Sequence, residues 1–150
     1  MGNNTYFVER NMKIQDQPGW KITFREYLMG RDRAVMPTNT EVANMTRLLV
    51  ALNALRHAYG KPMTVSSGWR PPFFNSKANG ARRSAHITGE ACDFVDTDGQ
   101  LAAYCLDNLE LLEKLGLYLE NPEKTKINQK GGWVHLQIRK PVSGKRIFDP

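Results

Sequence analysis

Two histidines and one aspartate are the residues of this sequence best suited to bind a metal ion. His86 and Asp93 lie seven positions apart in the stretch SAHITGEACDF, and His135 lies in GWVHLQI. Two imidazoles and one carboxylate make a three-ligand zinc site whose fourth position is open for water. An ion held in this way lowers the pKa of the bound water and polarises a carbonyl group. These residue types therefore indicate a candidate hydrolytic metal centre.

Their spacing alone leaves simpler interpretations open. His86 could be a loop histidine, Asp93 a turn residue at a strand end, and His135 a core histidine with satisfied hydrogen bonds. The pattern is weaker than His-Glu-x-x-His on a single helix. A metal site requires that two strands lie side by side and that the loop before Asp93 returns His86 to the same cleft.

The periodicity of apolar residues predicts the elements that would position this site. Helices are expected over 23–30, 37–60 and 100–116, and strands over 63–66, 90–96, 115–120 and 131–138. Pro71 and Pro72 interrupt regular structure, so 75–86 is expected to be a loop, and the tail 139–150 to wrap the domain or add an edge strand. The last two strands are consecutive, which favours an α+β domain over 1–150 with a small, mainly antiparallel sheet and flanking helices.

Composition narrows the class of protein without choosing a function. The net charge of +6 and the pI near 9.5 favour anionic partners, such as nucleic acid, anionic lipid or a cell wall. No basic and aromatic stripe argues for nucleic acid, and no apolar run is long enough for membrane insertion. Cys92 and Cys105 are expected to be buried, reduced thiols rather than part of a disulfide scaffold.

A hydrolytic metal site also needs a general base near the water. The position three residues before His135, convenient for a carboxylate, is occupied by Gly132. Glu120 ends an apolar strand. If that strand lies beside the strand of His135, it brings Glu120 to the site, so Glu120 is the preferred candidate. Glu123 is expected to face solvent from a polar loop, and Glu90 to be a surface acid.

Arg70 lies where a strand enters a turn stiffened by prolines. An arginine at this place could bind a substrate carboxylate with two hydrogen bonds or stabilise an oxyanion. The alternative is a structural hydrogen bond to the loop. His57, near a helix end, is expected to be a solvated residue without a role in the site.

Three motifs in order resemble one family. SAHITGEACDF matches Ser-x-His-x-x-Gly-x-Ala-x-Asp, GWVHLQI supplies Trp-x-His, and VSSGWRPPFFN resembles a Ser-Gly-aromatic-Arg-x-Pro stretch that ends in Asn. Over about 36–138 the chain resembles the zinc peptidases that include D-alanyl-D-alanine carboxypeptidases and dipeptidases and the L-alanyl-D-glutamate endolysins of phages. The segment KITFREYLMGRDRA is also similar to the one that precedes the first long helix in these proteins. The resemblance implies the hedgehog/D-Ala-D-Ala peptidase-like fold.

The resemblance also assigns roles to individual residues. It implies that His86, Asp93 and His135 hold one Zn²⁺, that Arg70 stabilises the substrate carbonyl or carboxylate, and that Ser84 lies beside the metal and contacts substrate. The base of the family is an acid shortly before the last histidine. Because this chain has glycine there, Glu120 is the expected base.

The expected function is hydrolysis of an amide bond in a peptidoglycan stem peptide by a monomeric single-domain enzyme. The small size and the absence of a classical secretory signal favour a phage-type endolysin, made in the cytoplasm and then released to the periplasm and cell wall, or a virion-associated lysin. Two alternatives remain: a D-alanyl-D-alanine carboxypeptidase or dipeptidase, and a non-enzymatic, metal-stabilised wall-binding or virion structural module.

Overall fold

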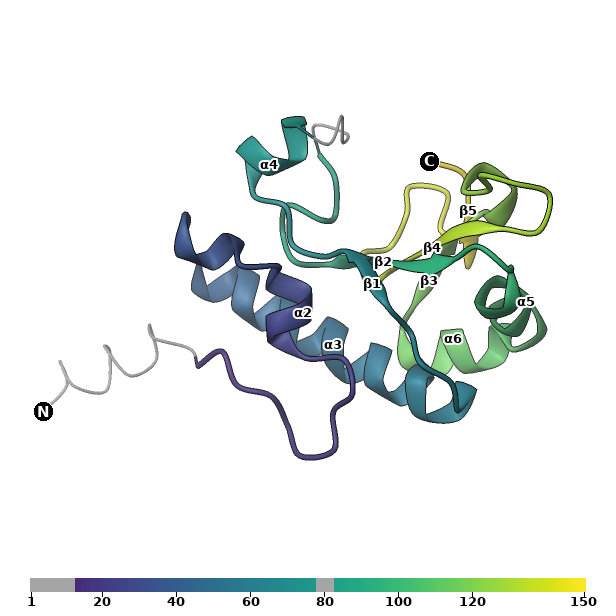
Figure 1. The fold of residues 1–150 in the computed structure, drawn as a ribbon, viewed down its shortest axis with the longest axis horizontal. Helices are drawn as coiled ribbons and strands as arrows, with labels where there is room; N and C mark the ends of the chain where they lie inside the picture. The colour runs from purple at the N-terminus through teal and green to yellow at the C-terminus, as the bar shows by residue number, and fades with distance from the viewer. Residues whose placement is uncertain (1–12, 78–82) are drawn as a thin grey trace, which may run out of the picture.

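The computed structural model of the protein describes residues 13–77 and 83–150, and Figure 1 shows their arrangement. The N-terminal segment, on which the expectation about a secretory signal rests, therefore lies outside the described residues. The centre of the predicted loop 75–86 also lies outside them. The helices are α2 (Phe24–Leu28), α3 (Asn39–Tyr59), α4 (Pro72–Lys77), α5 (Gln100–Asp107) and α6 (Leu109–Leu115), with 3-10 turns η1 (Arg31–Arg33) and η2 (Pro122–Lys124). The strands are β1 (Val65–Ser67), β2 (Ala91–Asp96), β3 (Tyr118–Glu120), β4 (Gly132–Gln137) and β5 (Ile147–Phe148).

The five strands form one sheet in the order β1-β2-β4-β3-β5. The pairs β1/β2, β2/β4 and β3/β4 are antiparallel, and only β3/β5 is parallel. The predicted α+β class with a small, mainly antiparallel sheet and flanking helices is therefore confirmed. The tail 139–150 was expected either to wrap the domain or to add an edge strand, and it forms the edge strand β5.

The long helix α3 follows from local signals in its sequence. Thr38 caps its N-terminus: its hydroxyl accepts a hydrogen bond from the backbone of Glu41, whose side chain accepts in return from the backbone of Thr38. Gly60 ends the helix in the left-handed conformation. In Figure 1, α3 and α6 lie below the strands, and α4 projects on the other side.

The hydrophobic core lies between these helices and one face of the sheet. Because side chains alternate along a strand, each strand sends its apolar residues to this face. Cys92 and Phe94 of β2, Val134 and Leu136 of β4 and Leu119 of β3 are buried there. Asp93 of β2 and His135 of β4 alternate with these residues and therefore point to the opposite face.

Two local predictions were wrong. The helix expected over 100–116 is two helices, because Asn108 leaves the helical conformation and its side-chain amide donates to the carbonyl of Tyr104. Residues 75–77, expected in a loop, belong to α4. Proline is compatible with the first turn of a helix, and here α4 begins at Pro72.

Two further features concern the cysteines and the helices. Cys92 and Cys105 are both buried and free. In the part of the chain that the structure describes, none of the helices has the length and apolar character required to cross a membrane.

Candidate metal centre and active site

Three candidate residues form a row across neighbouring strands on the polar face of the sheet. Asp93 of β2 pairs directly with His135 of β4. Tyr118 pairs with Gln137 and Leu119 with Leu136, so continuing this register sets Glu120 of β3 opposite His135 on the other side. The carboxylate of Asp93, the imidazole of His135 and the carboxylate of Glu120 thus come from three adjacent strands, as the sequence predicted.

His86 reaches the same place from the loop that precedes β2. Its ring Nδ1 lies 2.8 Å from the carbonyl oxygen of Gly68, and its backbone carbonyl accepts from the amide of Arg70. Gly68 in turn fits against α2 so closely that a Cβ atom would lie 1.9 Å from the carbonyl oxygen of Tyr27. The loop is therefore held over the strands as the metal-site hypothesis requires.

The ligand atoms of His86, Asp93 and His135 lie within 4.8 Å of one another. Nε2 of His86 is 3.2 Å from Oδ2 of Asp93, and Nδ1 of His135 is 2.8 Å from Oδ1. A tetrahedral zinc site separates its ligand atoms by about 3.3 Å, given zinc–nitrogen bonds of about 2.0 to 2.1 Å. The three side chains therefore need little movement to share one ion.

Each histidine makes a hydrogen bond through the ring nitrogen that points away from Asp93, and this bond determines which nitrogen faces Asp93. A carbonyl oxygen only accepts, so Nδ1 of His86 donates to Gly68 and leaves Nε2 without a proton in the neutral ring. Nε2 of His135 lies 2.7 Å from Oε1 of Gln137, whose amide nitrogen donates to the carbonyl of Arg139. His135 therefore donates from Nε2, and its Nδ1 is the atom left to face Asp93.

This arrangement fits a bound cation. Two ring nitrogens with free lone pairs converge on one carboxylate, and none of these atoms has a proton to share when both rings are neutral. Nε2 of His86 is buried and makes no hydrogen bond among the described residues, although Oδ2 of Asp93 is close. A buried polar atom without a partner is costly, and a metal ion would satisfy all three groups at once.

The protonation of these groups responds to burial and to their proximity. Burial lowers the pKa of the His86 imidazole, with Asp93 opposing this only in part. Burial would also lower the pKa of His135, but the hydrogen bond to Asp93, the charges of Asp93 and Glu120 and the contact with Gln137 together outweigh it and raise the pKa. For Asp93, burial acts to raise the pKa, and the two histidines more than reverse it, so the pKa lies below its ordinary value. Asp93 is therefore ionised at neutral pH, as a metal ligand must be.

Glu120 and His135 line one cavity of about 470 Å³. Its walls come from the loop 83–85, from β3 and β4 and from the C-terminal segment 139–150. Burial raises the pKa of Glu120, partly countered by His135. A carboxylate with a raised pKa is a stronger base than an exposed glutamate, which suits proton transfer near neutral pH.

The structure explains why no acid stands at position 132. A Cβ atom on Gly132 would lie 2.0 Å from the carbonyl oxygen of Thr125 and 2.7 Å from the amide nitrogen of Ile127. Only glycine fits at the start of β4 without a backbone shift. Among the acids weighed from the sequence, Glu120 is the one in the cavity with His135.

Ser84 and Arg70 lie on either side of His86. Ser84 lines the cavity, and its hydroxyl accepts a hydrogen bond from the backbone of His86. Arg70 is close enough to lower the pKa of His86, but it is not among the residues that line this cavity. Its Nε is buried and has no hydrogen-bond partner among the described residues.

The remaining candidates are placed away from the chemistry or differ from expectation. Glu123 is exposed and pairs with Lys126, and His57 is exposed on α3, both as predicted. Glu90, predicted to be a surface acid, is instead partly buried in an ion pair with Arg139. The prediction was wrong because the partner lies 49 positions further along the chain and is brought near only by the fold.

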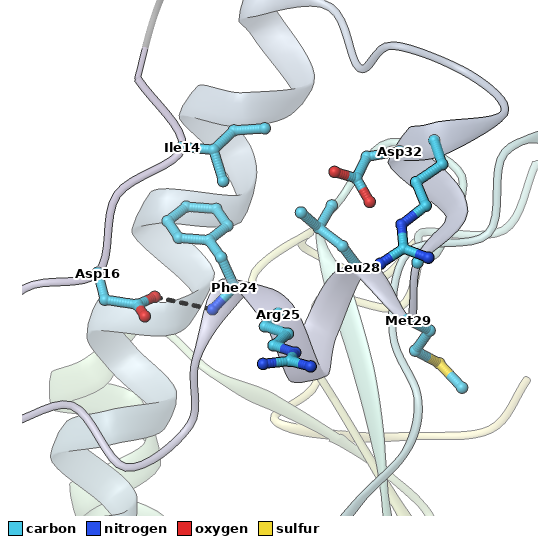
Figure 2. A pocket seen from close by; sticks show the side chains of 9 residues that line it. Ile14, Asp16, Phe24, Arg25, Leu28, Met29 and Asp32 are labelled. Atoms are coloured by element: carbon cyan, nitrogen blue, oxygen red, sulfur yellow. Dashed lines mark hydrogen bonds between the residues drawn. The ribbon is translucent and has the colours of Figure 1, made fainter.

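A larger cavity, of about 580 Å³, lies beside α2 and contains none of the candidate residues. Figure 2 shows its lining, with Ile14, Phe24 and Leu28 around the space. The dashed line marks the hydrogen bond from the backbone of Phe24 to the carboxylate of Asp16. That carboxylate is used to fix the segment before α2, so we assign this cavity no chemistry.

Sequence reasoning missed two residues that orient the histidines. Gln137 accepts from His135, and its position two residues further on the same face of β4 was a usable signal. The carbonyl of Gly68 holds His86, and no side-chain signal could have shown this. Both contacts are made by the ring nitrogen that does not face Asp93, and such hydrogen bonds set the tautomer and orientation of metal-binding histidines.

This chain is similar to one protein family and to two known proteins. The sequence model described as Peptidase M15 matches residues 22–136, which include all the candidate residues. A curated relative, the zinc D-Ala-D-Ala carboxypeptidase of Streptomyces albus G, is 44% identical over 55 residues, or 36% of this chain. The matched part spans only 22% of the length of that relative. The crystal structure of Serratia marcescens L-Ala D-Glu endopeptidase ChiX aligns with a TM-score of 0.45 and 18% identity, covering 71% of this chain and 91% of that one.

Proposed function

The chain belongs to the peptidase M15 family, as its motifs predicted, and from that premise we propose that it is a zinc-dependent peptidase acting on peptidoglycan stem peptides. The observation that carries the proposal is the convergence of His86, Asp93 and His135, with Glu120 in the adjoining cavity. The two similar proteins described above are, by their names, a carboxypeptidase and an endopeptidase for alanyl bonds. This supports a stem peptide as substrate and leaves either class of bond as the target.

The residues divide the work of hydrolysis among them. A zinc ion bound by His86, Asp93 and His135 supplies Lewis-acid chemistry for the attacking water and the scissile carbonyl. Glu120 accepts a proton from the water and later returns it to the leaving amine. Arg70, whose charge lies near His86, stabilises the oxygen on which negative charge develops. The hydroxyl of Ser84 accepts a hydrogen bond from the backbone amide of His86. Ser84 also lines the cavity, where it contacts the substrate.

Digestion of purified peptidoglycan tests this function and distinguishes the two bonds. The zinc-loaded protein is incubated with murein sacculi, and the released fragments are identified by mass. Cleavage within the stem peptide assigns an endopeptidase, and loss of terminal D-alanine alone assigns a carboxypeptidase. If no amide bond is cut by protein that holds zinc, the chain is a non-enzymatic metal-stabilised module and the proposal fails.

We further propose that the enzyme is a lysin of the phage type, acting as a monomer on the cell wall after release or from a virion. The net charge of +6 supports this setting, because it favours adsorption to an anionic wall. A fall in turbidity of permeabilised Gram-negative cells, abolished by Glu120→Gln, is the expected result. Release of fragments from isolated murein without any effect on cells would argue against the lytic role and leave the peptidase assignment intact.

A further inference from the structure

Arg139 lies just beyond the end of β4 and binds the loop that carries His86. Its Nη1 donates to the backbone carbonyl of Arg83 at 2.7 Å. Its Nη2 donates to the hydroxyl of Thr88 at 2.7 Å and to Oε1 of Glu90 at 2.9 Å, and its Nε donates to the same oxygen at 3.1 Å. One guanidinium group therefore binds the loop on both sides of His86.

The backbone of Arg139 is connected to the other histidine. Its carbonyl accepts from the amide of Gln137, and the amide oxygen of Gln137 accepts from Nε2 of His135. A continuous chain of hydrogen bonds thus leads from His135 through Gln137 and Arg139 to the loop of His86.

The rest of the loop is fixed from a different direction. The backbone amide of Arg70 donates to the carbonyl of His86, the indole of Trp69 donates to that of Ile87, and the side chain of Asn44 donates to that of Thr88. These groups come from α3 and the segment after β1. Arg139 holds the loop from the β4 side, where the active-site cavity opens.

We propose that Arg139 is a positioning residue that sets the affinity of the metal site by fixing the distance between His86 and the β2/β4 pair. The inference rests on the proposed metal site. A partly buried arginine that donates to three separate groups is preorganised for such a task, and a lysine cannot reproduce its fork of donors. Outer contacts of this kind typically change metal affinity by about 10- to 100-fold.

The test measures zinc affinity without substrate, by competition with a chromophoric chelator. Arg139→Ala removes the side-chain contacts and keeps the backbone carbonyl that Gln137 uses. It is expected to weaken zinc binding by about 10- to 100-fold. The matched control is Arg146→Ala, since Arg146 also donates to a backbone carbonyl, that of Leu117, without contacting the loop of His86. The control is expected to bind zinc as the wild type does.

A double-mutant cycle separates this role from a general loss of stability. If Arg139 acts through His86, then Arg139→Ala should cause no further loss of zinc affinity in a His86→Ala background. An equal loss in both backgrounds, or zinc binding by Arg139→Ala within about twofold of wild type, overturns the proposal. Should Arg139→Ala not fold, Glu90→Gln tests the same contact and should weaken binding several-fold. If the wild type itself binds no zinc, the proposed function fails instead, so the two failures are distinguishable.

Discussion

At the scale of single residues, the proposed catalysis depends most on Glu120. Its carboxylate lies beside His135 in the register of the sheet and lines the same cavity. Its environment is drier than that of the exposed Glu123, and burial raises its pKa. This contrast between two nearby glutamates offers a matched experiment.

Glu120→Gln is expected to reduce the rate of peptide hydrolysis by about 10²- to 10⁴-fold, because the amide cannot accept the proton of the water. The bound zinc should remain, since Glu120 is not among the three ligand residues. Rates on peptidoglycan and metal content measured on the same sample check both statements. Glu123→Gln serves as the control and should retain full activity, and a similar loss in both variants would contradict the assignment.

Arg70 provides a second prediction at this scale. Arg70→Lys keeps the charge but removes the planar set of donors, so hydrolysis should slow by about 10²-fold or more with little change in zinc affinity. Steady-state kinetics and chelator competition measure the two effects separately. Unchanged kinetics would mean that the buried Nε has a structural role only.

At the scale of elements, the start of β4 decides where the base can come from. Gly132 packs against the backbone of the segment 125–127 with no space for a side chain. Position 132 therefore cannot supply the carboxylate, which supports the proposal that Glu120 of β3 does so. An acid introduced at Gly132 should accordingly fail to act as the base.

Gly132→Glu, introduced into Glu120→Gln, is expected not to restore hydrolysis. The new side chain collides with backbone atoms, which should cost about 3 kcal/mol of folding free energy. Denaturant unfolding and the peptidoglycan assay together check this. Recovery of activity in the double variant would show that position 132 can supply the base.

The capping box of α3 offers a test of the scaffold alone. Thr38→Ala should lower the free energy of unfolding by about 1 kcal/mol, because the amide of Glu41 loses its acceptor. The nearby Thr40→Ala, an exposed change inside the same helix, is the control and should have little effect. Equal losses in the two variants would argue against the cap.

At the scale of the whole molecule, local signals proved easier to predict than contacts between distant segments. The bounds of α3 were predictable because Thr38 and Gly60 mark them within the sequence itself. The break at Asn108 was not, since the apolar pattern continues across it. Motifs and strand alternation predicted that the proposed metal ligands and Glu120 lie together, and the structure brings them to one place. The role of Gln137 was also readable from strand alternation, because it follows His135 by two positions on β4. The contact of His86 with the carbonyl of Gly68 and the Glu90–Arg139 pair depend instead on tertiary approach, which no spacing in the sequence encodes.

Metal binding should also stabilise the whole fold, since the site joins a loop to the centre of the sheet. Zinc at a hundredfold its dissociation constant is expected to add about 2.7 kcal/mol to the free energy of unfolding. Thermal unfolding with and without zinc, after treatment with a chelator, measures this. The shift should vanish in Asp93→Asn/His135→Ala, and a shift that persists there would place the ion elsewhere.

The central claim is that His86, Asp93 and His135 hold one zinc ion, and metal analysis of protein purified without chelator tests it most directly. The account predicts about one zinc per chain in the wild type and in Glu120→Gln, and a large loss in His86→Ala that remains folded. Less than about half an equivalent of zinc in the wild type after incubation with zinc, or unchanged zinc content in His86→Ala, would contradict it.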